Sequence, residues 1–215
     1  MVVGKSGPRV RREALLKAAA EVFFEQGYTA TSIDAIIERA GGSKRNIYNA
    51  FGNKEGLFSA IVVENADRVL STLALEEVEG HDLQETLMAF GLNLTAAYMS
   101  PALLGIYRIV VTEANRFPGL VKSFYQQGPG RAETRLAEVL EAAKARGEIQ
   151  TQDCLRAAGQ FAGMIRDNLH LQVILGLRPP PSDDEIKTSV SSAVNIFLNG
   201  IRPRKINQGK IPGKG

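Results

Sequence analysis

The fold of this chain is decided by residues 31–58, TSIDAIIERAGGSKRNIYNAFGNKEGLF. Two short amphipathic segments are separated by a pair of glycines, and a third segment begins just after another glycine. Apolar residues recur at helical spacing in the first segment, and Ile47 and Phe51 lie four residues apart in the second. The pattern predicts two short helices, a tight turn and the start of a third helix, which together make a helix-turn-helix.

The ends of these helices are marked by small polar residues and glycines. Thr31 is a candidate N-cap, with Asp34 at the spacing of a capping box. The two glycines of the turn end the first helix, since glycine readily adopts the positive φ of a helix exit. Ser43 and Asn53 are the candidate caps of the second and third helices.

The second helix has an outward face with no apolar side chain that needs burial. The residues on this face are Lys44, Arg45, Asn46, Tyr48 and Asn49. A short helix with such a surface has the size and the chemistry to lie in a DNA major groove. A polar helix face is also common where nothing is bound, so the motif alone leaves both interpretations open.

Further residues in and around this motif follow one another in a characteristic order. They are Ala18-Ala19-Ala20, Phe23, Gln26-Gly27-Tyr28, Thr31-Ser32-Ile33, Ile36, Ala40-Gly41, Ser43-Lys44, Tyr48, Phe51 and Lys54-Glu55-Gly56-Leu57-Phe58. On these residues the chain from about Arg9 to Ile61 resembles the N-terminal domain of the TetR family of transcriptional regulators. Gly42 and Ala50 depart from the usual family pattern. A looser likeness to the C-terminal domains of this family extends through 112–125 and 166–171.

The resemblance implies an all-α fold with two parts. A three-helix N-terminal DNA-binding domain would contain the helix-turn-helix, and a larger helical domain would bind ligand and form the dimer. The expected organisation is a flexible basic arm (1–8), the DNA-binding domain (9–61), the regulatory and dimerisation domain (62–201) and a disordered basic tail (202–215). Apolar periodicity and chain breakers predict the longer helices at 10–26, 54–79, 83–99, 101–116, 131–146, 152–175 and 183–200.

Nine residues are predicted to contact DNA. They are Thr31, Ser32, Ser43, Lys44, Arg45, Asn46, Tyr48, Asn49 and Lys54. Arg45 has a planar fork that matches the O6 and N7 atoms of guanine, so we expect it to read a base. Tyr48 and Lys54 are expected to hold phosphates, the latter from the N-terminus of a helix. The charge distribution agrees, because residues 1–60 hold nine Lys and Arg against six Asp and Glu.

A homodimer is expected through the last two long helices, which in this family pack against those of the partner. Residues 155–177 are apolar on more than one face, which indicates burial on several sides. Leu169 and Val194 are candidate positions at the interface. Two subunits would present two recognition helices about 34 Å apart, the distance between successive major grooves.

A small-molecule pocket is the usual switch in such regulators, and nine residues are candidates for its lining. They are Phe90, Asn93, Tyr98, Tyr107, Phe124, Phe161, Met164, Asn168 and His170. Most are aromatic or apolar, so the expected effector is largely apolar with one or two polar groups. Since most aromatic residues in helical proteins serve only as core, each is also open to that interpretation.

Other classes of protein find little support in the sequence. The single cysteine, Cys154, excludes an intrachain disulfide, and no apolar run approaches ~20 residues, so a cytoplasmic location is expected. No nucleophile, nucleotide-binding or zinc motif is present, so we expect no enzyme, no cofactor and no metal site. The predicted function is a homodimeric repressor that leaves its operator when a small ligand binds. The alternatives are a regulator controlled by a protein partner, and a helical domain whose helix-turn-helix is vestigial.

Overall fold

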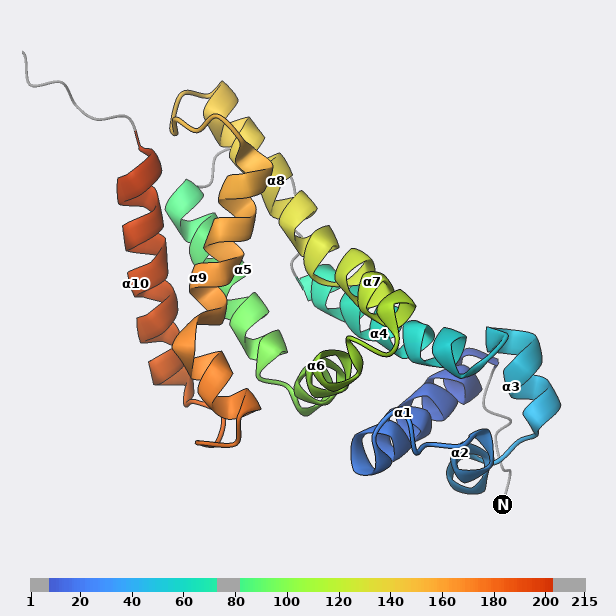
Figure 1. Ribbon diagram of the computed structural model, residues 1–215. Helices are drawn as coiled ribbons and strands as arrows, with labels where there is room; N and C mark the ends of the chain where they lie inside the picture. The colour runs from blue at the N-terminus through green and yellow to red at the C-terminus, as the bar shows by residue number, and fades with distance from the viewer. Residues whose placement is uncertain (1–7, 73–81, 203–215) are drawn as a thin grey trace, which may run out of the picture.

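Residues 8–72 and 82–202 are described by the structure, a computed structural model, and every regular element among them is an α-helix (Figure 1). Ten helices lie in these two ranges: α1 (Pro8–Gln26), α2 (Ile33–Ala40), α3 (Lys44–Phe51), α4 (Lys54–Thr72), α5 (Leu83–Tyr98), α6 (Pro101–Glu113), α7 (Pro118–Gln127), α8 (Pro129–Ala145), α9 (Cys154–Ile174) and α10 (Asp183–Ile201). The predicted all-α fold is confirmed, and the predicted helix ends that fall in the described ranges agree to within about three residues. Predictions for residues 1–7, 73–79 and 203–215 lie outside the described residues.

Helices α1 to α3 and the first half of α4 form a small N-terminal head (Figure 1). Its core is built around three aromatic rings that touch one another. The Phe23 ring stacks on Tyr28 at 5.6 Å between centroids, and Phe58 meets both rings edge-on at 5.4 and 5.6 Å. All three side chains are buried, so this cluster fixes how α4 leaves the head.

The remaining helices form the larger body. Helices α5, α9 and α10 lie side by side at the end of the molecule opposite the head, and α8 runs along α9 (Figure 1). Phe161 of α9 is fully buried between Phe90 and Phe197, with ring centroids 6.4 and 5.0 Å away. Within the described residues no single helix is both long and apolar enough to cross a bilayer. Only the bent pair α5 and α6, at 69° to each other, reaches that level together.

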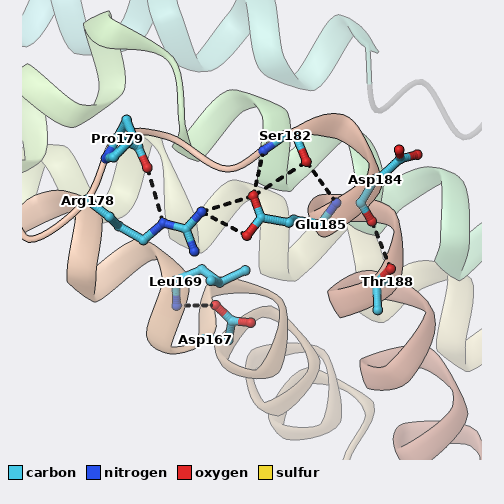
Figure 2. A network of polar contacts seen from close by, with 8 residues as sticks. All are labelled: Asp167, Leu169, Arg178, Pro179, Ser182, Asp184, Glu185 and Thr188. Atoms are coloured by element: carbon cyan, nitrogen blue, oxygen red, sulfur yellow. Dashed lines mark hydrogen bonds and ion pairs between the residues drawn. The ribbon is translucent and has the colours of Figure 1, made fainter.

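Helix α9 is bent in the middle, where the sequence predicted one continuous helix over 152–175. Asp167 has φ 25° and ψ −166°, which interrupts the helical hydrogen bonds. Its carboxylate accepts a hydrogen bond of 2.7 Å from the Leu169 amide (Figure 2) and another of 2.6 Å from the Ser189 hydroxyl of α10. Asp167 therefore satisfies the amide that its own conformation frees, and it ties the bend to the neighbouring helix.

The connection between α9 and α10 is held by charged and polar contacts (Figure 2). Ser182 and Glu185 form a reciprocal capping box at the start of α10. Arg178 donates to both carboxylate oxygens of Glu185, at 2.8 and 3.0 Å. These contacts lower the pKa of Glu185, chiefly through the Ser182 amide. They fix the angle at which the two helices form a hairpin.

One apolar cluster contains buried residues of both the head and the body. Ile106 and Ile109 of α6 and Leu120 of α7 are buried together with the core of the head. A Cβ atom on Gly105 would lie only 2.7 Å from the Phe24 ring of α1. The close approach of α6 to α1 therefore depends on a glycine at this position. Because α6 packs directly on the head, a movement of α6 also displaces residues of the head.

Candidate nucleic-acid interface and cavity

Helix α3 is short, well capped and almost entirely exposed. The Ser43 hydroxyl accepts from the Asn46 amide at 3.3 Å, and the Gly52 amide donates to the Tyr48 carbonyl at the other end. Of its eight residues only Ile47 is buried, with 2% of its surface exposed, and Phe51 is half-buried. The remaining six side chains point outward, as the sequence predicted. Five of these six are the polar or aromatic DNA-contacting candidates.

Helix α2 supports α3 from behind. Ile36 of α2 is fully buried in the core of the head. Arg39 of α2 donates two hydrogen bonds to the carboxylate of Glu25 in α1, at 2.6 and 2.7 Å. Lys44 of α3 contacts Asp34 of α2 at 2.8 Å, and this carboxylate raises the pKa of Lys44. Both side chains are exposed, so this ion pair is weak and a DNA phosphate can replace the carboxylate.

Thr31 lies inside the head, contrary to the prediction that it contacts DNA. Only 2% of its surface is exposed, and its hydroxyl donates to the Gly27 carbonyl at 2.7 Å. Its neighbour Ser32 is the N-cap of α2 and accepts from the Ala35 amide at 3.1 Å. The predicted cap is therefore wrong by one residue, because Thr31 and Ser32 carry the same capping signal and only burial distinguishes them.

Lys54 is also engaged within the protein, which leaves its ammonium no free donor for a phosphate. Its Nζ donates to the carbonyl oxygens of Tyr28, Thr29 and Thr31, at 2.8, 3.2 and 2.9 Å, and lies 4.7 Å from the centre of the Tyr28 ring. Burial lowers the pKa of Lys54. The predicted phosphate contact is contradicted by this geometry: Lys54 fastens the loop between α1 and α2 to the start of α4.

A second feature is an apolar cavity of about 50 Å³ in the body, enclosed by α4 to α9. Four of the nine predicted residues line it: Tyr98, Tyr107, Phe124 and His170. The sequence missed the contribution of α4, which supplies Val62, Ala66, Val69 and Leu70, and it missed Arg166. Helix α4 was predicted to enter the core, but nothing in its pattern distinguishes a cavity wall from a packed one.

The other five predicted residues do not line this cavity. Phe90 and Phe161 are core residues, and Met164 packs against the same cluster. Asn93 is exposed, and its side chain donates to the Thr72 carbonyl at 3.0 Å. Asn168 is exposed beside the bend of α9.

The polar groups of the cavity gather at one side. The His170 ring lies 5.7 Å from the Tyr98 ring and 5.2 Å from the Tyr107 ring. The guanidinium carbon of Arg166 lies 5.8 and 5.9 Å from the centres of the same two tyrosine rings. Burial, followed by the charge of Arg166, lowers the pKa of His170 to about 4, so the imidazole is neutral at pH 7.

A helix-turn-helix on a small helical head, joined to a helical body with an apolar cavity, is the architecture of a DNA-binding regulator. Two family descriptions match the chain: "Bacterial regulatory proteins, tetR family" over residues 15–61 and "AefR-like transcriptional repressor, C-terminal domain" over residues 85–200. The chain therefore belongs to the TetR family of transcriptional regulators, whose members bind operator DNA and act as dimers.

Individual relatives agree. A solved structure named Flavonoid-responsive Regulator FrrA is similar with 32% identity and a TM-score of 0.76, over 91% of this chain and 99% of that one. YvkB of Bacillus subtilis, described as an uncharacterized regulator, is 26% identical over 90% of this chain and 98% of its own length. The transcriptional activator FasR of Mycolicibacterium smegmatis is 43% identical over 61 residues, which is only 28% of either chain.

Proposed function

We propose that this protein is a homodimeric transcriptional repressor that binds its operator through α3 and is released by a small, largely apolar ligand. The observation that carries the proposal is the exposed polar face of α3, held by caps at both ends and by the buried Ile47. An isolated eight-residue helix is not stable in water, so only its packing on the head keeps this face ordered. Such a helix is suited to insertion into a major groove.

The side chains of α3 divide by chemistry. Arg45 is assigned to a guanine, with Asn46 and Asn49 as further base contacts. Lys44 reaches either a base or a phosphate once it leaves Asp34. Tyr48 is 47% exposed, so its hydroxyl is assigned to a phosphate. The hydroxyls of Ser32 and Ser43, exposed at the starts of α2 and α3, are assigned to phosphates beside it.

Dimerisation is assigned to the outer face of α9 and α10 (Figure 1). Large apolar side chains are exposed there: Leu155 at 54%, Leu171 at 52% and Ile196 at 62%. The interface positions expected from the sequence need correction. Val194 is 1% exposed within the subunit core, and Leu169 is partly buried in a cluster with Met99, Leu104 and Val173. We therefore assign the dimer interface to Ile196 and Leu155 instead.

Control by a ligand is supported by the aromatic lining of the cavity. FrrA is described as responsive to flavonoids, which are planar aromatic compounds, and we propose an apolar, largely planar ligand for this chain. A volume of about 50 Å³ holds only a few water molecules, whereas a drug-sized ligand needs roughly 300–1,000 Å³. Side chains such as Phe124 must therefore move outward when the ligand enters.

Two helices connect the cavity to the head. Helix α4 lines the cavity with Val62 and Ala66 and packs Leu57 and Phe58 into the head. Helix α6 presents Tyr107 to the cavity and Ile106 and Ile109 to the head. A ligand that widens the cavity by displacing either helix changes the spacing between the two heads of a dimer. The ligand thus shifts the population toward a state that cannot bind DNA.

The choice of repressor over activator is supported by the description of the C-terminal match as repressor-like, while FasR is named an activator. A genomic fragment captured by the purified protein, placed in a reporter promoter, decides between them. We expect the protein to lower transcription of the reporter. Higher transcription would contradict the repressor assignment while leaving DNA binding intact.

A second candidate is favoured by the small size of the cavity. A regulator controlled by a protein partner needs no internal space, and about 50 Å³ is little for a ligand. Aromatic compounds titrated into the protein–fragment complex separate the two. Release by any of them supports the ligand, whereas release only by a cell extract that retains proteins supports the partner.

A further inference from the structure

One cavity residue has a charge that the function proposed above leaves unused. Arg166 is the only charged residue among the described residues that line the cavity. It lies in α9 directly before the bend at Asp167, and it is half-buried. A guanidinium carries five N–H donors and keeps its charge at any physiological pH. No nitrogen atom of its side chain is both buried and without a partner, so the guanidinium remains accessible to a bound molecule.

Within residues 8–72 and 82–202, Arg166 contacts aromatic faces but no acid. Its guanidinium carbon lies 5.8 Å from the ring of Tyr98 and 5.9 Å from that of Tyr107, at the outer range of a cation–π contact. Among residues 8–72 and 82–202, no ion pair and no hydrogen bond is found for its side chain.

Two acids act on cavity residues, Asp167 on His170 and Glu133 on Tyr98, and both are already engaged elsewhere. Asp167, the next residue, accepts hydrogen bonds from the Leu169 amide and the Ser189 hydroxyl, at 2.7 and 2.6 Å. Glu133 of α8 accepts from the Tyr125 hydroxyl at 3.0 Å. Both carboxylates therefore have other donors, and Arg166 keeps its positive charge at the edge of the cavity without a carboxylate partner in the described part of the chain.

We infer that the ligand of this cavity is an acid, in which an aromatic body fills the apolar part and one carboxylate pairs with Arg166. The inference rests on the proposed ligand control and names the chemical class of the effector. A planar guanidinium binds a carboxylate through two parallel hydrogen bonds, which gives orientation as well as affinity. Tyr98 and Tyr107, whose rings already flank the guanidinium, present their faces to the aromatic body of the ligand.

His170 completes the recognition without competing for the acid. Because its imidazole is neutral at pH 7, it adds no second positive charge and is free to exchange a hydrogen bond with a hydroxyl or a carboxylate oxygen of the ligand. One fixed cation beside one neutral imidazole suits a singly charged acid. A phosphate, with about two charges, would find only one cation among the lining residues.

The test compares acids with their uncharged isosteres. Cinnamate, 4-hydroxycinnamate and 2-naphthoate are each titrated into the full-length protein beside the corresponding primary amide, by isothermal titration calorimetry at pH 7.5. We expect at least one acid to bind about 10- to 100-fold more tightly than its amide, the range of a charge-assisted pair. If no acid in the panel binds better than its amide, including the case in which none binds at all, the inference is overturned.

Variants assign the preference to Arg166. Arg166→Met should bind acid and amide alike, and Arg166→Lys should restore part of the preference. Arg156→Met is the matched control, because Arg156 lies on the same helix, is exposed and pairs with Asp153 at 3.7 Å outside the cavity. It should keep the full preference. The wild-type comparison needs no variant, so it stays decisive even where Arg166→Met fails to fold.

The same titrations separate this inference from the function proposed above. Release of a captured DNA fragment is measured with each compound. If amides and acids bind and release DNA equally, ligand control stands and the acid inference fails. If an acid binds in an Arg166-dependent way and DNA stays bound, the acid inference stands and the release mechanism fails.

Discussion

Glu113, at the end of α6, accepts two hydrogen bonds from Thr29 in the loop between α1 and α2. The carboxylate oxygen lies 3.1 Å from the Thr29 amide and 2.8 Å from its hydroxyl. Six residues earlier on the same helix, Tyr107 lines the cavity. This contact joins the head to a helix that lines the cavity, so it is a direct mechanical link between the cavity and the DNA-binding head.

Glu113→Ala should therefore weaken both stability and coupling. We expect the free energy of unfolding to fall by about 1 kcal/mol, the usual net value of lost hydrogen bonds of this kind. We also expect a bound acid to change DNA affinity less than in the wild type. The control is Glu138→Ala, which removes only an exposed contact with Arg135 and should cost under about 0.5 kcal/mol. Equal effects of the two substitutions would argue against the link.

Lys54→Met separates a structural role from a phosphate contact. The change leaves three carbonyl oxygens without their donor, so we expect a loss of about 1–3 kcal/mol in the free energy of unfolding. In binding assays on folded protein, the slope of log affinity against log salt should stay as in the wild type. A slope reduced by about 0.9 would mean that Lys54 does neutralise a phosphate. The exposed Lys17→Met serves as the control for stability.

His170 should make the protein less stable in acid. Its pKa of about 4 in the folded chain lies below the usual 6.5, so the unfolded chain takes up a proton first as the pH falls. The stabilising contribution is complete above pH 6.5 and is lost between about 6.5 and 4. Between pH 7 and pH 5 the loss is about 2 kcal/mol. Urea unfolding at fixed protein concentration measures it, and His170→Gln should remove that part of the pH dependence. An unchanged profile in the variant would show that other groups cause it.

Ile196→Asp should disrupt the dimer without unfolding the subunit. Ile196 is 62% exposed on α10, so a charge costs little in a monomer but cannot be hydrated inside an interface. Light scattering at micromolar concentration should give twice the chain mass for the wild type and one chain mass for the variant. Val111→Asp, on a residue of α6 that is 56% exposed, should remain dimeric. A dimeric Ile196→Asp would place the interface elsewhere.

The sequence predicts the helices well because their signals are local. Ser43, Asn53 and Ser182 are caps whose hydrogen bonds depend on residues three positions away. The exposed face of α3 was predictable for the same reason. The family resemblance then supplied the function, which no local pattern on its own could give.

The errors lie where several distant elements meet. Lys54 donates to three carbonyls that lie more than twenty residues earlier in the chain. The spacing of apolar residues in the sequence does not predict such a contact. Asp167 breaks a segment whose apolar pattern is helical throughout, because its carboxylate is satisfied by Ser189 on another helix. Arg166 was overlooked as a cavity residue because a charged residue next to an acid resembles an ordinary surface pair.

The measurement that tests the central claim most directly is the selection of binding sites from a random duplex library by the wild type and by Arg45→Ala. We expect the wild type to select a repeated half-site and the variant to lose its preference at one base pair in each half-site. Its affinity for the best site should fall by ~1–3 kcal/mol. An unchanged preference in Arg45→Ala, or no selected duplex with the wild type, would contradict the assignment of α3 as the helix that reads DNA.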